Sequence, residues 1–218
     1  MSWVKGRVDL CFYGFLIATA VAIVLSQSRK SHINDGISFP DGFSKLPLHL
    51  RDVEQLVSKI TPNKKYSYWN YTSVLGGYKT IIWFKGDSLL RKRLHFKMPG
   101  YGVFSSNSIS KTYSYVEFID NDTMRFANNK ADIIEFIGKV DNIEEATLIA
   151  NLNNLHPDYD DNRGSCYRET SENYQIYLMS FEGCPESRQS VLATISKSGR
   201  FDARFLEVYQ QSNDCYSH

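Results

Sequence analysis

The stretch "EGCPESRQSVLATISKSGRFDARFLEVYQQSNDC", residues 182–215, contains two strand-like segments with a cysteine beyond each outer end. The segments at 190–197 and 201–209 predict two antiparallel strands, because successive strand residues point to opposite faces of a sheet. The residues that join them include Gly199, which suits the left-handed backbone of a tight turn. This hairpin predicts an antiparallel sheet near the end of the chain.

The same hairpin brings Cys184 and Cys215 to one end of the sheet, in loops that can adopt disulfide geometry. We therefore predict a Cys184–Cys215 disulfide, and we expect Cys166 to lie at the same edge as a free, buried or intermolecular thiol. The cysteine spacing lacks the C-x-x-C pairs typical of structural zinc sites and redox motifs. We predict neither a metal nor a cofactor.

Outside this hairpin, the same patterns indicate more strands and a few helices. The predicted strands are 66–71, 77–85, 89–98, 113–119, 123–127, 166–170 and 174–182. Apolar stripes predict helices at 51–61 and 141–155, the second with Asp141 as N-cap and Glu144 completing a capping box. Residues 130–140 fit either a strand or a helix. The sequence predicts an α+β fold of two helix-on-antiparallel-sheet modules, 49–139 and 140–218, after a linker at 29–48.

The N-terminal residues decide the expected compartment. The run "LCFYGFLIATAVAIVL", residues 10–25, has no charged side chain. It predicts a signal anchor within residues 1–28, retained as a single transmembrane helix, or else a signal peptide cleaved near Ser28. In the first case the protein is expected in a bacterial inner membrane, single-pass, with its C-terminal domain in the periplasm. In the second it is secreted or periplasmic.

Charge is unevenly distributed along the chain. Residues 31–218 contain 21 basic and 23 acidic side chains, which excludes the strong basic excess of a general nucleic-acid binder. Residues 79–97 nevertheless hold six Lys and Arg against one Asp. If Gly86-Asp87 forms a two-residue hairpin turn, strand alternation places four basic side chains on one face. These four are Arg91, Arg93, His95 and Lys97.

This basic strand face predicts a docking surface for an anionic partner or a protein; the other reading is a solvated strand whose charges deter edge pairing. The loop "HPDYDDNRG", 156–164, departs from a calcium-binding loop because Gly164 comes one position late, which leaves a looser cation site or a plain acidic turn. The chain contains no G-x-S-x-G, H-E-x-x-H or Walker motif.

The leading functional hypothesis is a membrane-tethered interaction module facing the periplasm, either an inhibitor or immunity protein or an adaptor in envelope assembly. One alternative is a hydrolase or transferase acting on cell-envelope glycans, which a pocket joining a carboxylate to His95 or His156 would favour. The other is an anionic-lipid-binding domain that uses Arg91, Arg93 and Lys97.

Overall fold

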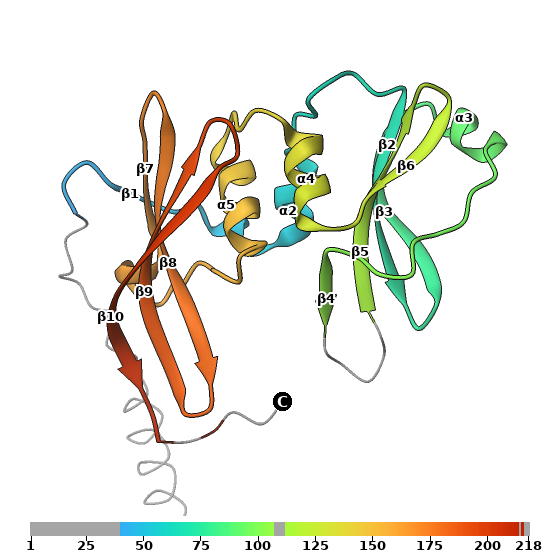
Figure 1. Cartoon of the computed structure of the whole chain (residues 1–218). Helices are drawn as coiled ribbons and strands as arrows, with labels where there is room; N and C mark the ends of the chain where they lie inside the picture. The colour runs from blue at the N-terminus through green and yellow to red at the C-terminus, as the bar shows by residue number, and fades with distance from the viewer. Residues whose placement is uncertain (1–39, 107–111, 214, 216–218) are drawn as a thin grey trace, which may run out of the picture. The chain divides into compact units, whose positions relative to one another are not determined.

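The computed structural model describes residues 40–106, 112–213 and 215, and these form an α+β fold with two antiparallel sheets and few helices (Figure 1). The α+β class predicted from the sequence is confirmed. Sheet A has the strand order β1-β7-β8-β9-β10. Its strands are β1 Ser44–Lys45, β7 Cys166–Glu169, β8 Asn173–Gly183, β9 Glu186–Ser196 and β10 Phe201–Gln211.

Sheet B has the order β3-β2-β5-β4, with β6 also paired to β5. Its strands are β2 Tyr68–Leu75, β3 Tyr78–Gly86, β4 Phe104–Ser106, β5 Thr112–Asp120 and β6 Thr123–Ala127. The α-helices are α2 Val53–Ser58, α3 Ser88–Arg93, α4 Lys130–Ile137 and α5 Ile143–Asn151. Two 3₁₀ helices, η1 Leu48–Arg51 and η2 Asn162–Gly164, complete the fold.

One continuous apolar cluster joins the two sheets. Helices α2, α4 and α5 lie between them (Figure 1) and bury their apolar faces against one face of each sheet. The strands contribute alternate residues to this cluster, because successive strand side chains point to opposite faces of a sheet. These strand residues are Trp69, Tyr71 and Val116 from sheet B and Tyr174, Ile176, Leu178, Val191, Ala193 and Ile195 from sheet A. Leu46 and Leu50 attach the start of the described chain to the same core.

The C-terminal hairpin forms as predicted. Strand β10 pairs with β9 in an antiparallel register that matches Phe201 with Ile195. The turn is closed by a hydrogen bond from the Ser196 N–H to the Arg200 carbonyl, and Gly199 has a φ of 81°. A side chain at Gly199 would need this strained left-handed conformation, which explains why glycine suits the turn.

The Cys184–Cys215 disulfide is confirmed, with a Cα–Cα distance of 4.3 Å. It ties the turn between β8 and β9 to the residues that follow β10. Cys166 does not lie at this edge. Because β7 has only four residues, Cys166 pairs with Tyr177 in the middle of β8, where its thiol is free and fully buried.

The helix expected at 141–155 is present, but its cap is shifted by one residue. The N-cap is Asn142, whose side-chain oxygen accepts a hydrogen bond of 2.8 Å from the Glu145 N–H. The Glu145 carboxylate in turn accepts from the Asp141 N–H at 2.7 Å. Asn142 and Glu145, rather than the predicted Asp141 and Glu144, therefore satisfy N–H groups at the start of α5, and Glu145 reaches one residue further back than in a capping box. Residues 130–140, ambiguous in the sequence, contain α4.

The strand predicted at 89–98 is wrong. Residues Ser88–Arg93 form α3, and residues 94–103 continue without regular secondary structure. Gly86-Asp87 is not a hairpin turn, because Asp87 is the N-cap of α3 and accepts from the Leu89 and Leu90 N–H groups at 2.9 and 3.3 Å. These two hydrogen bonds satisfy donors at the helix start and favour the helix over a strand.

None of the helices within the described ranges is both long and apolar enough to cross a membrane. The apolar run 10–25, predicted to be a membrane anchor or signal peptide, lies outside those ranges.

Candidate functional site

The four predicted binding residues do not share one face. Arg93, His95 and Lys97 are exposed, whereas the Arg91 side chain is only 18% exposed and points to the sheet. Lys92 is also exposed, beside Arg93. The reason is the helical periodicity of α3, which separates Arg91 from Arg93 and places residues on different faces than a strand would.

Arg91 belongs to a buried ionic cluster centred on Glu117. The Glu117 carboxylate is fully buried and accepts hydrogen bonds from Arg91 Nε at 2.5 Å, Lys79 Nζ at 2.6 Å and Asn70 Nδ2 at 2.6 Å. Burial by itself would raise the pKa of Glu117. The three hydrogen bonds outweigh burial and hold this pKa below its ordinary value of 4.5. Glu117 is therefore ionised and fixes α3 against sheet B.

The segment after α3 folds over this cluster. The ring of Phe96 lies 5.1 Å from Lys79 Nζ and 5.3 Å from Arg91 Cζ, distances at which a cation interacts with an aromatic face. Phe96 also packs against Phe126 of β6. Lys79 and Arg91 are thus structural residues, although the sequence pattern grouped them with the exposed cations. The sequence signal for this cluster is Glu117, the single charged residue within the apolar segment "YSYVEFI", residues 113–119.

The cations that stay exposed are Lys92, Arg93, His95 and Lys97, which we call the basic surface. Among the residues that the structure describes, none of the four forms an ion pair or a side-chain hydrogen bond. The one acidic residue between positions 79 and 97, Asp87, caps α3. Four cationic or protonatable groups on six consecutive residues are therefore available to a partner.

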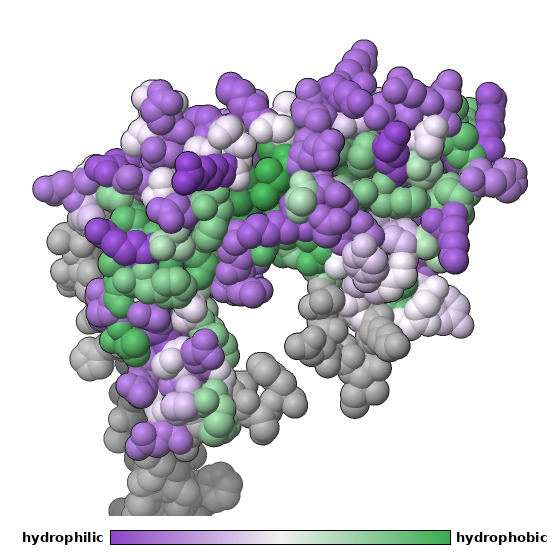
Figure 2. All heavy atoms as spheres, in the orientation of Figure 1, coloured by the Kyte–Doolittle hydropathy of each residue, from purple (hydrophilic) through white to green (hydrophobic). Residues whose placement is uncertain are grey.

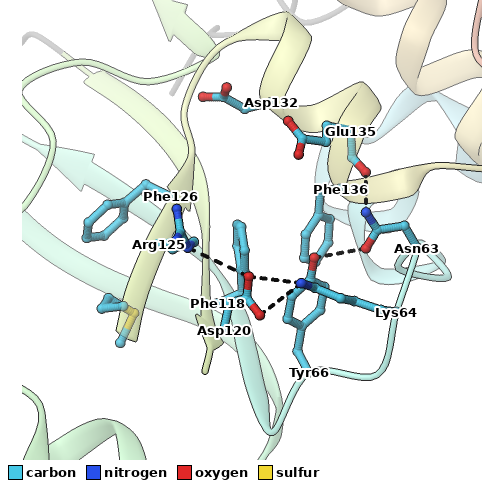
Figure 3. A pocket seen from close by; sticks show the side chains of 11 residues that line it. Asn63, Lys64, Tyr66, Phe118, Asp120, Arg125, Phe126, Asp132, Glu135 and Phe136 are labelled. Atoms are coloured by element: carbon cyan, nitrogen blue, oxygen red, sulfur yellow. Dashed lines mark hydrogen bonds and ion pairs between the residues drawn. The ribbon is translucent and has the colours of Figure 1, made fainter. Parts of the chain in front are cut away.

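A pocket of about 600 Å³ lies between the β5–β6 hairpin, α4 and the loop before β2 (Figure 3). The rings of Tyr66, Phe118 and Phe136 pack together at its base, with centroids 4.7 to 5.2 Å apart. At its rim Lys64 binds Asp120 at 2.9 Å, and Arg125 approaches the same carboxylate at 3.7 Å. This carboxylate is thus already shared between two cations.

A second pocket, of about 490 Å³, lies on the face of sheet A away from the helices and is lined by Phe43, Tyr177 and Arg204 among others. Neither pocket includes His95 or His156, the two residues whose convergence with a carboxylate would favour a hydrolase. His156 instead pairs through its backbone with Met179, and burial lowers the pKa of its imidazole.

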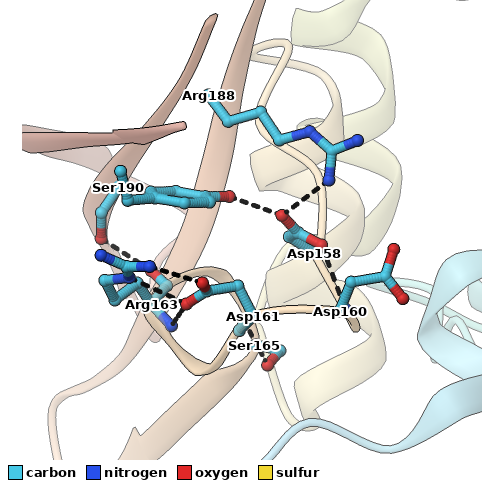
Figure 4. A network of polar contacts seen from close by, with 8 residues as sticks. Asp158, Asp160, Asp161, Arg163, Ser165, Arg188 and Ser190 are labelled. Atoms are coloured by element: carbon cyan, nitrogen blue, oxygen red, sulfur yellow. Dashed lines mark hydrogen bonds and ion pairs between the residues drawn. The ribbon is translucent and has the colours of Figure 1, made fainter. Parts of the chain in front are cut away.

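Two of the three carboxylates of the acidic loop 156–164 are already hydrogen-bonded, those of Asp158 and Asp161 (Figure 4). Asp158 is 4% exposed and accepts from Tyr209 Oη at 2.6 Å and from Arg188 Nη1 at 3.2 Å. Asp161 accepts from Arg163 Nε at 2.9 Å and Nη2 at 2.6 Å. Asp158 thus ties the loop to β9 and β10. Because basic and hydroxyl groups already bind the oxygens of Asp158 and Asp161, these two carboxylates are not free to bind a cation.

Within residues 40–106, 112–213 and 215, no group of three or more His, Cys, Asp or Glu side chains is arranged to hold a metal ion. Cys166, the free thiol in the described part of the chain, is also poorly suited to chemistry, because burial raises its pKa to about 12.

No family model matches the chain, and comparison with curated proteins and with solved structures finds no match either.

Proposed function

We propose that this protein is a membrane-tethered interaction module that faces the periplasm and binds an anionic partner through the basic surface. In this role it acts as an inhibitor or immunity protein, or as an adaptor in envelope assembly. The observation that carries the proposal is the contrast within one basic stretch. Lys79 and Arg91 share the buried carboxylate of Glu117, whereas Lys92, Arg93, His95 and Lys97 are exposed and have no counter-ion among the described residues.

The disulfide supports the compartment. Disulfides persist in oxidising environments such as the periplasm, and Cys184–Cys215 joins two loops of sheet A. The uncharged run 10–25 supports export, either as a retained anchor in a bacterial inner membrane or as a signal peptide removed near Ser28. Neither feature depends on the identity of the partner.

The rigid position of the basic surface also supports binding. Asp87 caps α3, Arg91 anchors its last turn to Glu117, and Phe96 packs over the same cluster. A surface fixed in this way loses little conformational entropy when a partner binds.

Affinity capture of the full-length protein from native membranes after mild crosslinking tests the proposal. The test variant carries Lys92→Glu, Arg93→Glu and Lys97→Glu. Arg91 is left unchanged, because its loss would unpair the buried Glu117 and disturb the fold. The control variant carries Lys59→Glu, Lys65→Glu and Arg200→Glu, three exposed residues whose side chains make no ion pair with the described chain.

We expect an abundant partner that is captured by wild type and by the control variant but lost from the test variant. Capture that is equal for all three proteins would refute binding through the basic surface. Turnover of a cell-envelope glycan by the purified protein would instead favour the hydrolase or transferase alternative.

A further inference from the structure

Exposed apolar side chains are frequent in the stretch of sequence that contains the basic surface. Of the eleven large hydrophobic residues exposed in the described chain, seven lie between positions 75 and 101. They are Leu75, Tyr78, Ile81, Phe84, Leu89, Met98 and Tyr101. Figure 2 shows hydrophobic and hydrophilic side chains lying next to one another at the right-hand end of the view, where Figure 1 places β2, β3 and α3.

The strand register shows that Phe84 lies on the face of sheet B that carries α3. Phe84 pairs with Asn70 across β2 and β3, so both point to the same side of sheet B. The Asn70 side chain reaches Glu117 on that side, and Glu117 is also the partner of Arg91 from α3. Phe84 and α3 therefore lie on one face of the sheet.

Residues of α3 and the following segment complete the surface. Leu89, in the first turn of α3, is 59% exposed, and Phe84 is 52% exposed. Met98 follows the last cation of the basic surface and is 40% exposed. The apolar side chains thus flank the cations along the chain instead of forming a separate patch.

We propose that this face docks on a lipid bilayer that contains anionic headgroups. Single apolar side chains interspersed with unpaired Lys and Arg are typical of protein segments that lie in the membrane interface. The cations contact lipid phosphates, while Phe84, Leu89 and Met98 enter the boundary between headgroups and acyl chains. The inference rests on the proposed function, because it names the anionic partner of the basic surface.

Charge complementarity favours this occupant. Lys92, Arg93 and Lys97 make no ion pair with the described residues, and the single acid between positions 79 and 97 is used as a helix cap. Each Lys or Arg close to an anionic membrane surface strengthens binding about fivefold. Three such residues, with the apolar contacts, are enough to orient a domain that a tether already holds near the bilayer.

Lysine acetylation of the full-length protein in nanodiscs tests the proposal. One nanodisc preparation contains phosphatidylcholine alone, and the other contains added phosphatidylglycerol. We expect acetylation of Lys92 and Lys97 to slow by roughly fivefold or more when phosphatidylglycerol is present, with the protection lost at high salt. Lys59 and Lys65 serve as internal controls and should react equally in both. Equal acetylation of Lys92 and Lys97 in the two preparations would overturn the proposal.

A double variant distinguishes docking on a bilayer from binding to a soluble polyanion. Leu89→Ser with Met98→Ser leaves every cation in place and alters only exposed side chains. If the bilayer is the partner, this variant loses a large part of the protection that phosphatidylglycerol confers. Protection equal to that of wild type would show that the apolar residues do not enter the membrane, which contradicts the proposal.

The nanodisc experiment tests the lipid partner, and the capture experiment tests the proposed function, so either proposal can be rejected without the other. If nanodiscs give no protection but a protein is still captured through the basic surface, the proposed function stands and the lipid partner is rejected. If both experiments are negative, binding through this surface is rejected altogether.

Discussion

At the scale of single residues, sheet B buries two polar side chains that differ in whether they are hydrogen-bonded. Glu117 brings a full charge into the sheet and receives three hydrogen-bond donors from Asn70, Lys79 and Arg91. Tyr115, two residues earlier on the same strand, buries a hydroxyl that finds no hydrogen-bond partner among the described residues. The first group should stabilise the fold only while it is ionised, and the second should not stabilise it at all.

We predict that Glu117→Gln lowers the free energy of unfolding by about 3–5 kcal/mol, because it leaves Arg91 and Lys79 without their buried counter-ion. The folded-state pKa of Glu117 lies below its ordinary value of 4.5, so its stabilisation is complete above that pH. It is lost as the pH falls from about 4.5 through the folded-state pKa.

Urea denaturation across the acidic range checks this prediction. Wild type should lose stability there, and Glu117→Gln should lose less over the same interval. Glu135→Gln is the matched control, since that carboxylate is exposed and makes no ion pair or hydrogen bond with the described residues. Similar free energies and pH profiles for the two variants would contradict the role given to Glu117.

Tyr115→Phe should be neutral or should stabilise the protein by up to about 1 kcal/mol, because it removes a buried hydroxyl without breaking a hydrogen bond. Tyr71→Phe makes the same chemical change where the hydroxyl does bond, to Ser114 Oγ at 2.7 Å, and should cost about 1–2 kcal/mol. Denaturation of both variants under one condition gives the comparison. The prediction fails if Tyr115→Phe is the more destabilised.

At the scale of secondary-structure elements, the sequence predicts some segments far better than others. Strands β8, β9 and β10 follow from alternation and short turns, since neighbours in the sequence are also neighbours in the sheet. Residues 89–98 also alternate, yet Asp87 caps a helix there. Alternation of charge fits an exposed strand and an exposed short helix equally well, and only the N-cap and the pairing of Arg91 with Glu117 distinguish them.

The disulfide is an element-scale constraint, because it closes the open end of sheet A between the β8–β9 turn and the chain after β10. Replacing Cys184 and Cys215 together by serine should lower the free energy of unfolding by roughly 3–4 kcal/mol, mainly by freeing the unfolded chain. Denaturation with and without dithiothreitol measures the effect. The reductant should weaken wild type and leave the double variant unchanged; an equal response of both proteins would contradict the prediction.

At the scale of the whole described molecule, the two sheets share a single core. Helix α5 places Leu148, which is fully buried, in the cluster that both sheets line. A core of this kind predicts that residues 40–213 unfold in one cooperative transition, because the same helices cover the inner faces of both sheets.

Leu148→Ala should therefore cost about 2–5 kcal/mol and weaken both sheets together. Fluorescence of Trp69 and Trp83 follows sheet B, and hydrogen exchange of β8 and β9 follows sheet A. Both probes should give the same shifted midpoint. Loss of sheet A protection at a lower denaturant concentration than the fluorescence change would show that the sheets are independent units.

The sequence by itself determined the α+β class, the C-terminal hairpin and the Cys184–Cys215 pairing, because these depend on local periodicity and on turns of a few residues. Only the tertiary structure decided which cations are free. Glu117 is 26 residues from Arg91 and 38 from Lys79, and their pairing follows from the register of β2 between β3 and β5. A buried charge must be paired, and the fold decides which side chains lie close enough to pair with it. Lys79 and Arg91 lie beside Glu117, whereas Lys92, Arg93, His95 and Lys97 are on the surface.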